Sequence, residues 1–275
     1  MASEFKKQKQ YSDEDMIKLL KSIDGKKKVY LTGGEPLLYK DLDRLLNDMQ
    51  MQISDISIGM FTTGIMWRAG EANAISEEYA RRLASCGLKV CYLSIYSHLE
   101  QDHDWMTRLQ GSYKILNESI THLQVAGIET RFNSVVTKKN ILCFNDIIRF
   151  AESMKITEVR ILKLIRHGRA NEYWREIGVS EQDYRDLIIN ILKRENKVRI
   201  TASGIVDILP CREGCKRSFC PAGKEIIYVT NSGDIFPCAS VKGKIDYEIG
   251  NISDLNIAEN LRLFLFGFNG RMLCK

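Results

Sequence analysis

Short apolar runs alternate with amphipathic stretches along the first two thirds of this chain. The apolar runs, rich in branched and aromatic residues that favour strands, occupy 29–32, 53–63, 89–96, 129–137 and 158–165. The stretches with helical spacing lie over 12–23, 41–51, 76–86, 113–126, 144–154 and 181–194. Strands separated by helices of about a dozen residues form parallel βα units. The pattern therefore predicts an α/β domain whose sheet is covered by helices.

A candidate ligand site follows the first apolar run, in the sequence Gly33-Gly34-Glu35-Pro36. Paired glycines let the backbone approach a bound molecule, Glu35 places a carboxylate beside the exposed amides, and Pro36 stiffens the exit. Open α/β sheets and barrels hold their ligands at strand ends of this kind. Taken alone, these residues fit a tight turn and a solvated glutamate equally well, so their context decides.

Five short sequences follow one another along the predicted strands and their exits. They are GGEP at 33–36, FTTG at 61–64, YLSIYS at 92–97, HDWMTRLQGSY at 103–113 and FNSVVTKKN at 132–140. In this order they resemble the radical S-adenosylmethionine (radical SAM) enzymes, and the resemblance runs from about Tyr11 to the C-terminus. It implies a partial (β/α)6 barrel of the TIM type with the first strand missing, followed by a small Cys-rich α+β C-terminal domain.

By this resemblance, S-adenosylmethionine (SAM) would bind across the strand tips. The residues implied for the cofactor are Gly33, Gly34, Glu35, Pro36, Thr63, Ser94, Arg108 and Asn133. The GGEP backbone and Glu35 would receive the methionyl amino group. Ser94 and Arg108 would hold the carboxylate, Asn133 would lie near the ribose, and the strand over 161–165 would back the adenine. The residue types agree, because an ammonium needs acceptors, a carboxylate needs a hydroxyl or guanidinium, and adenine needs an apolar wall.

The family's Cys-x3-Cys-x2-Cys motif, whose thiolates hold a [4Fe–4S] cluster, does not occur in this sequence. The charged start of the chain leads into a predicted first helix at 12–23, which Ser12 should cap. We therefore expect the first strand and the cluster loop to lie upstream of Met1. Cys86, Cys91 and Cys143 fall at helix ends or inside a strand and should be small buried apolar residues.

Four of the eight cysteines lie close together in the last third of the chain: Cys211, Cys215, Cys220 and Cys238. A hairpin predicted from 225–230 and 234–236 brings them to one end, which suits a thiolate site for zinc or an iron–sulfur cluster. The spacing from Cys220 through Gly233 to Cys238 resembles the auxiliary-cluster domain called SPASM, or Twitch in its shorter form. It implies one auxiliary [4Fe–4S] cluster. Zinc on the same thiolates is the alternative, and the sequence assigns no role to Cys274.

Composition sets the remaining bounds. A chain of 275 residues with 44% hydrophobic content can bury a large core, and we divide it into a barrel over 1–200 and an auxiliary domain over 201–275. No run approaches the ~20 apolar residues of a membrane span. The net charge of +5 is modest, and no nucleic-acid motif accompanies the basic patches. Free cysteines, an implied cluster and no signal peptide indicate a reducing cytoplasm.

The resemblance implies an enzyme that reductively cleaves SAM and abstracts a hydrogen atom from a substrate. The HD…GS stretch and the C-terminal domain point to a peptide or protein substrate, and the chemistry implies a reductant protein such as flavodoxin or ferredoxin. Two alternatives stay open. One is a non-catalytic radical SAM-like binding protein without the radical cluster, and the other is an α/β scaffold with a structural zinc site. The sequence identifies neither the substrate nor the oligomeric state.

Overall fold

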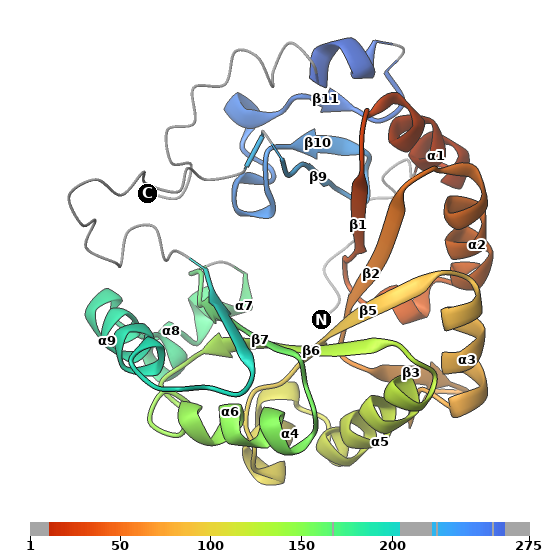
Figure 1. Ribbon diagram of the computed structural model, residues 1–275. Helices are drawn as coiled ribbons and strands as arrows, with labels where there is room; N and C mark the ends of the chain where they lie inside the picture. The colour runs from red at the N-terminus through yellow and green to blue at the C-terminus, as the bar shows by residue number, and fades with distance from the viewer. Residues whose placement is uncertain (1–10, 167, 204–221, 224, 255, 262–275) are drawn as a thin grey trace. The chain divides into compact units, whose positions relative to one another are not determined.

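The computed structural model describes residues 11–166, 168–203, 222–223, 225–254 and 256–261, and the chain divides into two compact units (Figure 1). The sheet unit consists of Lys28–Asn47 and Ser57–Leu209. The terminal unit consists of Met1–Lys27, Asp48–Ile56 and Pro210–Lys275. The predicted domain boundary at residue 200 stays a prediction.

A six-stranded sheet in the order β1-β2-β5-β6-β7-β8 is the framework of the sheet unit. Its strands are β1 (Lys27–Leu31), β2 (Ile56–Thr62), β5 (Leu88–Ser94), β6 (Glu129–Val136), β7 (Glu158–Lys163) and β8 (Arg199–Ala202). Every pairing from β2 to β8 is parallel, and the sheet is curved, with helices on its outer side (Figure 1). The predicted partial barrel is therefore confirmed. The sequence did not predict β8, a strand of only four residues.

The helices begin where the sequence supplies caps. They are α1 (Asp13–Ser22), α2 (Leu42–Gln52), α3 (Glu77–Ser85), α4 (Glu100–Thr107), α5 (Ser112–Val125), α6 (Phe144–Ser153), α7 (Arg169–Glu172), α8 (Trp174–Ile177) and α9 (Glu181–Leu192). The hydroxyl oxygens of Ser12, Ser76 and Ser180 each accept a backbone N–H from the first turn of α1, α3 and α9. The predicted Ser12 cap is confirmed.

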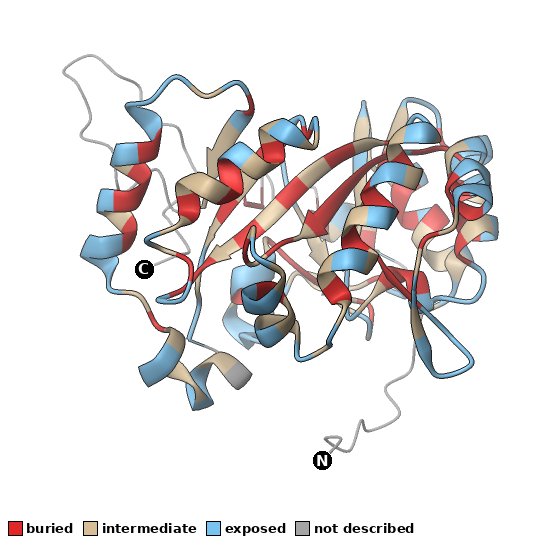
Figure 2. Cartoon of the chain, turned by 90° about the horizontal axis from the view of Figure 1, so that it is seen from below, coloured by how far each residue is buried: buried red, intermediate tan, exposed pale blue. Residues whose placement is uncertain are grey.

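The strands present alternate residues to two faces, as β6 shows most clearly. Thr130, Phe132, Ser134 and Val136 are buried beneath the helices, and Phe132 stacks on Phe150 of α6 with ring centroids 6.0 Å apart. In Figure 2 the helices carry buried residues (red) on the side that faces the sheet and exposed residues (pale blue) on the side that faces away from it. The alternate β6 positions, 129, 131, 133 and 135, lie on the opposite face, which we call the inner face. Their in-register neighbours on adjacent strands share it.

A hairpin that the sequence did not predict follows β2. It consists of β3 (Ile65–Arg68) and β4 (Glu71–Ala74), which pair antiparallel. The buried Ser119 of α5 holds both of its ends, because its hydroxyl donates to the Gly64 carbonyl at 2.6 Å and accepts the Ile75 N–H at 2.9 Å. The hairpin is thus fixed to α5.

The terminal unit contains a small antiparallel sheet of β9 (Tyr228–Val229), β10 (Asp234–Phe236) and β11 (Gly250–Asn251). The predicted hairpin is confirmed by the pairing of β9 with β10, although its first arm is shorter. Two 3₁₀ turns, Ala239–Val241 and Ile245–Tyr247, connect β10 to β11. The apolar core of this unit joins Leu19 of α1 to residues from the other end of the chain: Ile235, Ile252, Ile257 and Leu261.

Candidate functional site

The GGEP sequence forms the loop after β1 and leads into the 3₁₀ turn Pro36–Leu38. Gly33 has a φ of +142°, a backbone conformation that residues with a Cβ rarely adopt. A Cβ added at Gly33 or Gly34 would meet no atom within 4 Å. The loop therefore presents bare backbone to open space at the carboxyl end of β1.

The Glu35 carboxylate ties this loop to the end of β2. Thr62 Oγ1 donates to Oε1 at 2.5 Å, while the N–H and hydroxyl of Thr63 donate to Oε2 at 2.8 and 2.6 Å. The N–H of Leu37 also donates to Oε1, at 3.2 Å. Four donors thus occupy the four lone-pair positions of the carboxylate. Thr63, one of the predicted cofactor residues, takes part in this contact, together with Thr62, which was not predicted.

Ser94 and Asn133 lie side by side on the inner face. Ser94 ends β5 and is in register with Asn133 of β6, which is in register with Arg160 of β7. The Asn133 side-chain oxygen Oδ1 is buried and accepts no hydrogen bond among the described residues. A buried acceptor without a donor costs about 1–3 kcal/mol, so this atom marks a place where a ligand donor would be stabilising.

Arg108 is not brought to this row by any contact of the described residues. It ends α4 in the left-handed conformation, with φ of +59°, and its exposed guanidinium lies 4.8 Å from the ring centroid of Tyr173. Hydrogen bonding to Tyr173 raises the pKa of Arg108. Its predicted contact with the cofactor carboxylate stays a prediction.

The His-Asp…Gly-Ser stretch builds the junction between α4 and α5. The Asp104 carboxylate accepts from the Gly111 N–H at 2.6 Å, the Ser112 hydroxyl at 2.8 Å and the Tyr113 N–H at 2.9 Å. These hydrogen bonds hold the pKa of Asp104 below its ordinary value, although desolvation opposes them. The neighbouring His103 is buried, which lowers its pKa to about 4. In the described structure, Asp104 acts as the N-terminal cap of α5.

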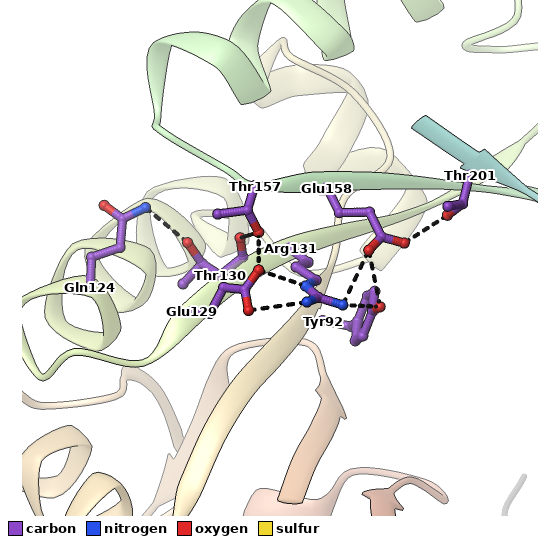
Figure 3. Close-up of polar contacts among 8 residues, drawn as sticks. All are labelled: Tyr92, Gln124, Glu129, Thr130, Arg131, Thr157, Glu158 and Thr201. Atoms are coloured by element: carbon purple, nitrogen blue, oxygen red, sulfur yellow. Dashed lines mark hydrogen bonds and ion pairs between the residues drawn. The ribbon is translucent and has the colours of Figure 1, made fainter. Parts of the chain in front are cut away.

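A polar network lies on the inner face near the start of β6 and β7 (Figure 3). The Arg131 guanidinium donates to both oxygens of Glu129, at 2.9 and 3.0 Å, and pairs with Glu158 at 3.1 Å. It also donates to the Tyr92 hydroxyl at 2.7 Å, and Thr201 donates to Glu158 at 2.7 Å. The Glu129 ion pair raises the pKa of Arg131 and lowers that of Glu129.

This network was not predicted, although the sequence contains a signal for it. Glu129 and Arg131 of β6, and Glu158 and Arg160 of β7, are charged residues two positions apart, which is the spacing of a polar face on a strand. Tyr92 also joins the network to an aromatic cluster, since its ring centroid lies 5.8 Å from that of Tyr30 and 4.9 Å from that of Phe61.

The cysteines of the described residues form no metal site. Cys91 is buried in β5, where burial raises its pKa, as expected of a small apolar residue. Cys86 and Cys143 are only half-buried, at the end of α3 and the start of α6. Cys238 is half-buried directly before a 3₁₀ turn. The other predicted metal ligands, Cys211, Cys215 and Cys220, lie outside the described residues.

In the part of the chain that the structure describes, no helix is both long and apolar enough to cross a bilayer.

Curated relatives of two kinds are similar to this chain in sequence. The AdoMet-dependent heme synthase of Oleidesulfovibrio alaskensis is 23% identical over 253 residues, which cover 84% of this chain and 61% of the relative. The GTP 3',8-cyclase of Campylobacter curvus is 26% identical over 235 residues, covering 78% and 65%. The chain therefore spans less than two thirds of either relative.

Solved structures share the fold. Native anSMEcpe with bound AdoMet matches with a TM-score of 0.66 at 18% identity, over 94% of this chain and 71% of that one. Streptococcus suis SuiB bound to its precursor peptide SuiA matches with a TM-score of 0.70 at 16% identity, over 94% and 60%. The family model of the radical SAM superfamily matches residues 2–151. Because this match covers more than half of the chain, the protein belongs to the radical SAM superfamily.

Proposed function

We propose that the sheet unit binds SAM across the carboxyl ends of β1, β2, β5 and β6 and serves hydrogen-atom abstraction from a substrate. The observation that carries this proposal is the buried Asn133 Oδ1 without a donor, in register with Ser94. A ribose hydroxyl supplies the donor that this oxygen lacks. The residues present therefore fit the adenosyl part of the cofactor.

The bare loop at Gly33 and Gly34 fits the methionyl end. The space beside these two glycines is open, so an ammonium group can approach the loop and donate hydrogen bonds to its carbonyl oxygens. Glu35 has both oxygens engaged by Thr62, Thr63 and Leu37, so we assign it to fixing the loop and to adding negative charge beside the amino group. This refines the expectation that the carboxylate itself receives the amino group.

When it is bound beside a reducing iron–sulfur cluster, SAM supplies a carbon radical that abstracts hydrogen. This chain's own contribution is to bind the cofactor, to orient it against the sheet and to exclude water. Among the described residues, no group of thiolates fits the radical cluster.

For the substrate we propose a peptide or protein. The support is the fold shared with SuiB, whose structure holds a precursor peptide. For the terminal unit we propose an auxiliary [4Fe–4S] cluster on Cys211, Cys215, Cys220 and Cys238. The support is the thiolate spacing together with the position of Cys238 just after the β9–β10 hairpin.

The cofactor site can be tested by saturation-transfer NMR with SAM at millimolar concentration. We expect weak binding to the wild-type chain, because the cofactor's amino and carboxylate groups would lack their iron ligand. Gly34→Val should abolish it, since the new side chain occupies open space without touching the protein. Asn133→Ala should weaken it, and Asn145→Ala, at a half-buried position on α6, should not.

Tight binding that survives Gly34→Val would refute the assignment of the GGEP loop. Absence of any saturation transfer from the wild-type protein to SAM would refute the cofactor site as a whole. Far-UV circular dichroism of each variant verifies that the fold is kept.

A further inference from the structure

Arg160 is a half-buried cation on the inner face of the sheet unit. It is in register with Asn133 on one side and Thr201 on the other. Its guanidinium carbon lies 5.8 Å from the ring centroid of Phe61 and 5.9 Å from that of Tyr92. The side chain of this β7 residue thus extends across the sheet, toward rings that belong to β5 and β2.

The carboxylates near this face are engaged elsewhere. Glu129 and Glu158 both pair with Arg131, and Glu158 also accepts from Thr201 (Figure 3). Glu35, at the end of β1, accepts four hydrogen bonds from its own loop and the end of β2. Among the described residues, Arg160 forms no ion pair with a carboxylate.

The aromatic contacts leave the hydrogen-bonding capacity of Arg160 available. A guanidinium lying against aromatic rings uses its flat face, whereas its five N–H donors point outward in its plane. A planar fork of donors matches the two oxygens of a carboxylate or phosphate. Partial burial strengthens that attraction, because screening by water is weaker there.

The position of Arg160 connects it to the cofactor row. Ser94, Asn133 and Arg160 occupy consecutive strands at the same level of the sheet. If the first two hold the cofactor, a group bound at Arg160 lies next to it on the same face. We propose that Arg160, resting on Phe61 and Tyr92, binds an oxyanion of the substrate, either a carboxylate or a phosphate. This inference rests on the proposed function, which places the substrate beside SAM.

Inorganic phosphate is the probe for the anion site. Its titration should shift the Nε–Hε resonance of Arg160 in ¹H–¹⁵N spectra. Arg160→Gln should weaken phosphate binding about tenfold or more, because it removes charge-assisted hydrogen bonds. Arg160→Lys should keep part of the affinity, since the charge stays but the fork is lost. Arg175→Gln, at an exposed arginine on α8, is the control and should bind as wild type does.

Phosphate affinity that is equal in wild type, Arg160→Gln and Arg160→Lys would overturn the anion site. The two conservative replacements guard against misfolding of one of them. The resonance shift in the unmodified protein gives an independent readout, and an Arg160 signal that stays fixed during the titration would also overturn the proposal.

A second arm separates the substrate from the cofactor as the source of the oxyanion. SAM and its decarboxylated form are compared by saturation-transfer NMR on wild type and Arg160→Gln. We expect each form to bind Arg160→Gln as well as it binds wild type. If the variant loses SAM but retains the decarboxylated form, Arg160 holds the cofactor carboxylate and the substrate assignment is wrong. If phosphate binding depends on Arg160 while neither form binds wild type, the proposed function fails and the anion site stands without a substrate.

Discussion

Replacing Arg131 with methionine should destabilise the sheet unit strongly. Glu158 is 5% exposed and its carboxylate lies 3.1 Å from the Arg131 guanidinium. At that distance and an effective dielectric constant of about 20, the Coulomb attraction is about 5 kcal/mol. Arg131→Met leaves the Glu158 charge buried with only Tyr92 and Thr201 as partners. Removing one partner of a buried pair costs about 3–5 kcal/mol of the free energy of unfolding, and we expect a loss in this range.

Replacing the partner instead, with Glu158→Gln, should lower the free energy of unfolding by less, because Arg131 keeps its two hydrogen bonds to Glu129. The double variant Arg131→Met/Glu158→Gln should lose less than the sum of the single variants, since no unpaired charge stays at position 158. Urea unfolding followed by circular dichroism measures all three. The control is Arg149→Met, which breaks an exposed pair with Asp146 and should cost within about 1 kcal/mol. If Arg131→Met costs no more than this control, the reasoning about the network is refuted.

Three further predictions concern pH, metal and packing. Burial lowers the pKa of His103 from 6.5 to about 4, so the unfolded chain takes up the proton first. The contribution of His103 to the free energy of unfolding should be constant above about pH 6.5 and fall by about 3 kcal/mol toward pH 4. His103→Gln should remove this pH dependence, as measured by urea unfolding at a series of pH values. Protein purified without oxygen should carry about four irons per chain, lost in Cys238→Ala and kept in Cys143→Ala, whereas about one zinc and no iron would favour the structural zinc site. Leu19→Ala should cost about 2–5 kcal/mol and speed hydrogen exchange in β10, because Leu19 is 3% exposed in the core of the terminal unit; unchanged exchange would contradict that packing.

The sequence predicted most of the sheet unit because its signals are local. Apolar periodicity located five of the six strands to within a few residues, and the glycines of GGEP marked the loop after β1. The strands β3, β4 and β8 were not predicted, because each has only four residues and is too short to show a period of apolar positions.

The contacts within the site could not be predicted, because they depend on register between strands far apart in the sequence. Nothing in the sequence places Arg131 opposite Glu158, or shows that Glu35 is held by Thr62 and Thr63. A shift of one residue in β6 or β7 would send Arg131 or Glu158 to the other face of the sheet. The His-Asp…Gly-Ser stretch pointed by resemblance to a peptide or protein substrate, whereas in the structure Asp104 accepts backbone N–H groups at the start of α5.

The packing of α1 affects how this protein can be synthesised. Helix α1 carries Leu19, whose partners Ile252 and Leu261 are translated long after it. Until then α1 has an apolar side without its native cover, while the strands of the sheet unit can already pair in the order in which they emerge. Contacts between such distant residues form slowly. The core of the terminal unit can therefore form only after Ile252 and Leu261 have left the ribosome, and nascent chains would expose the apolar side of α1 to chaperones during that interval.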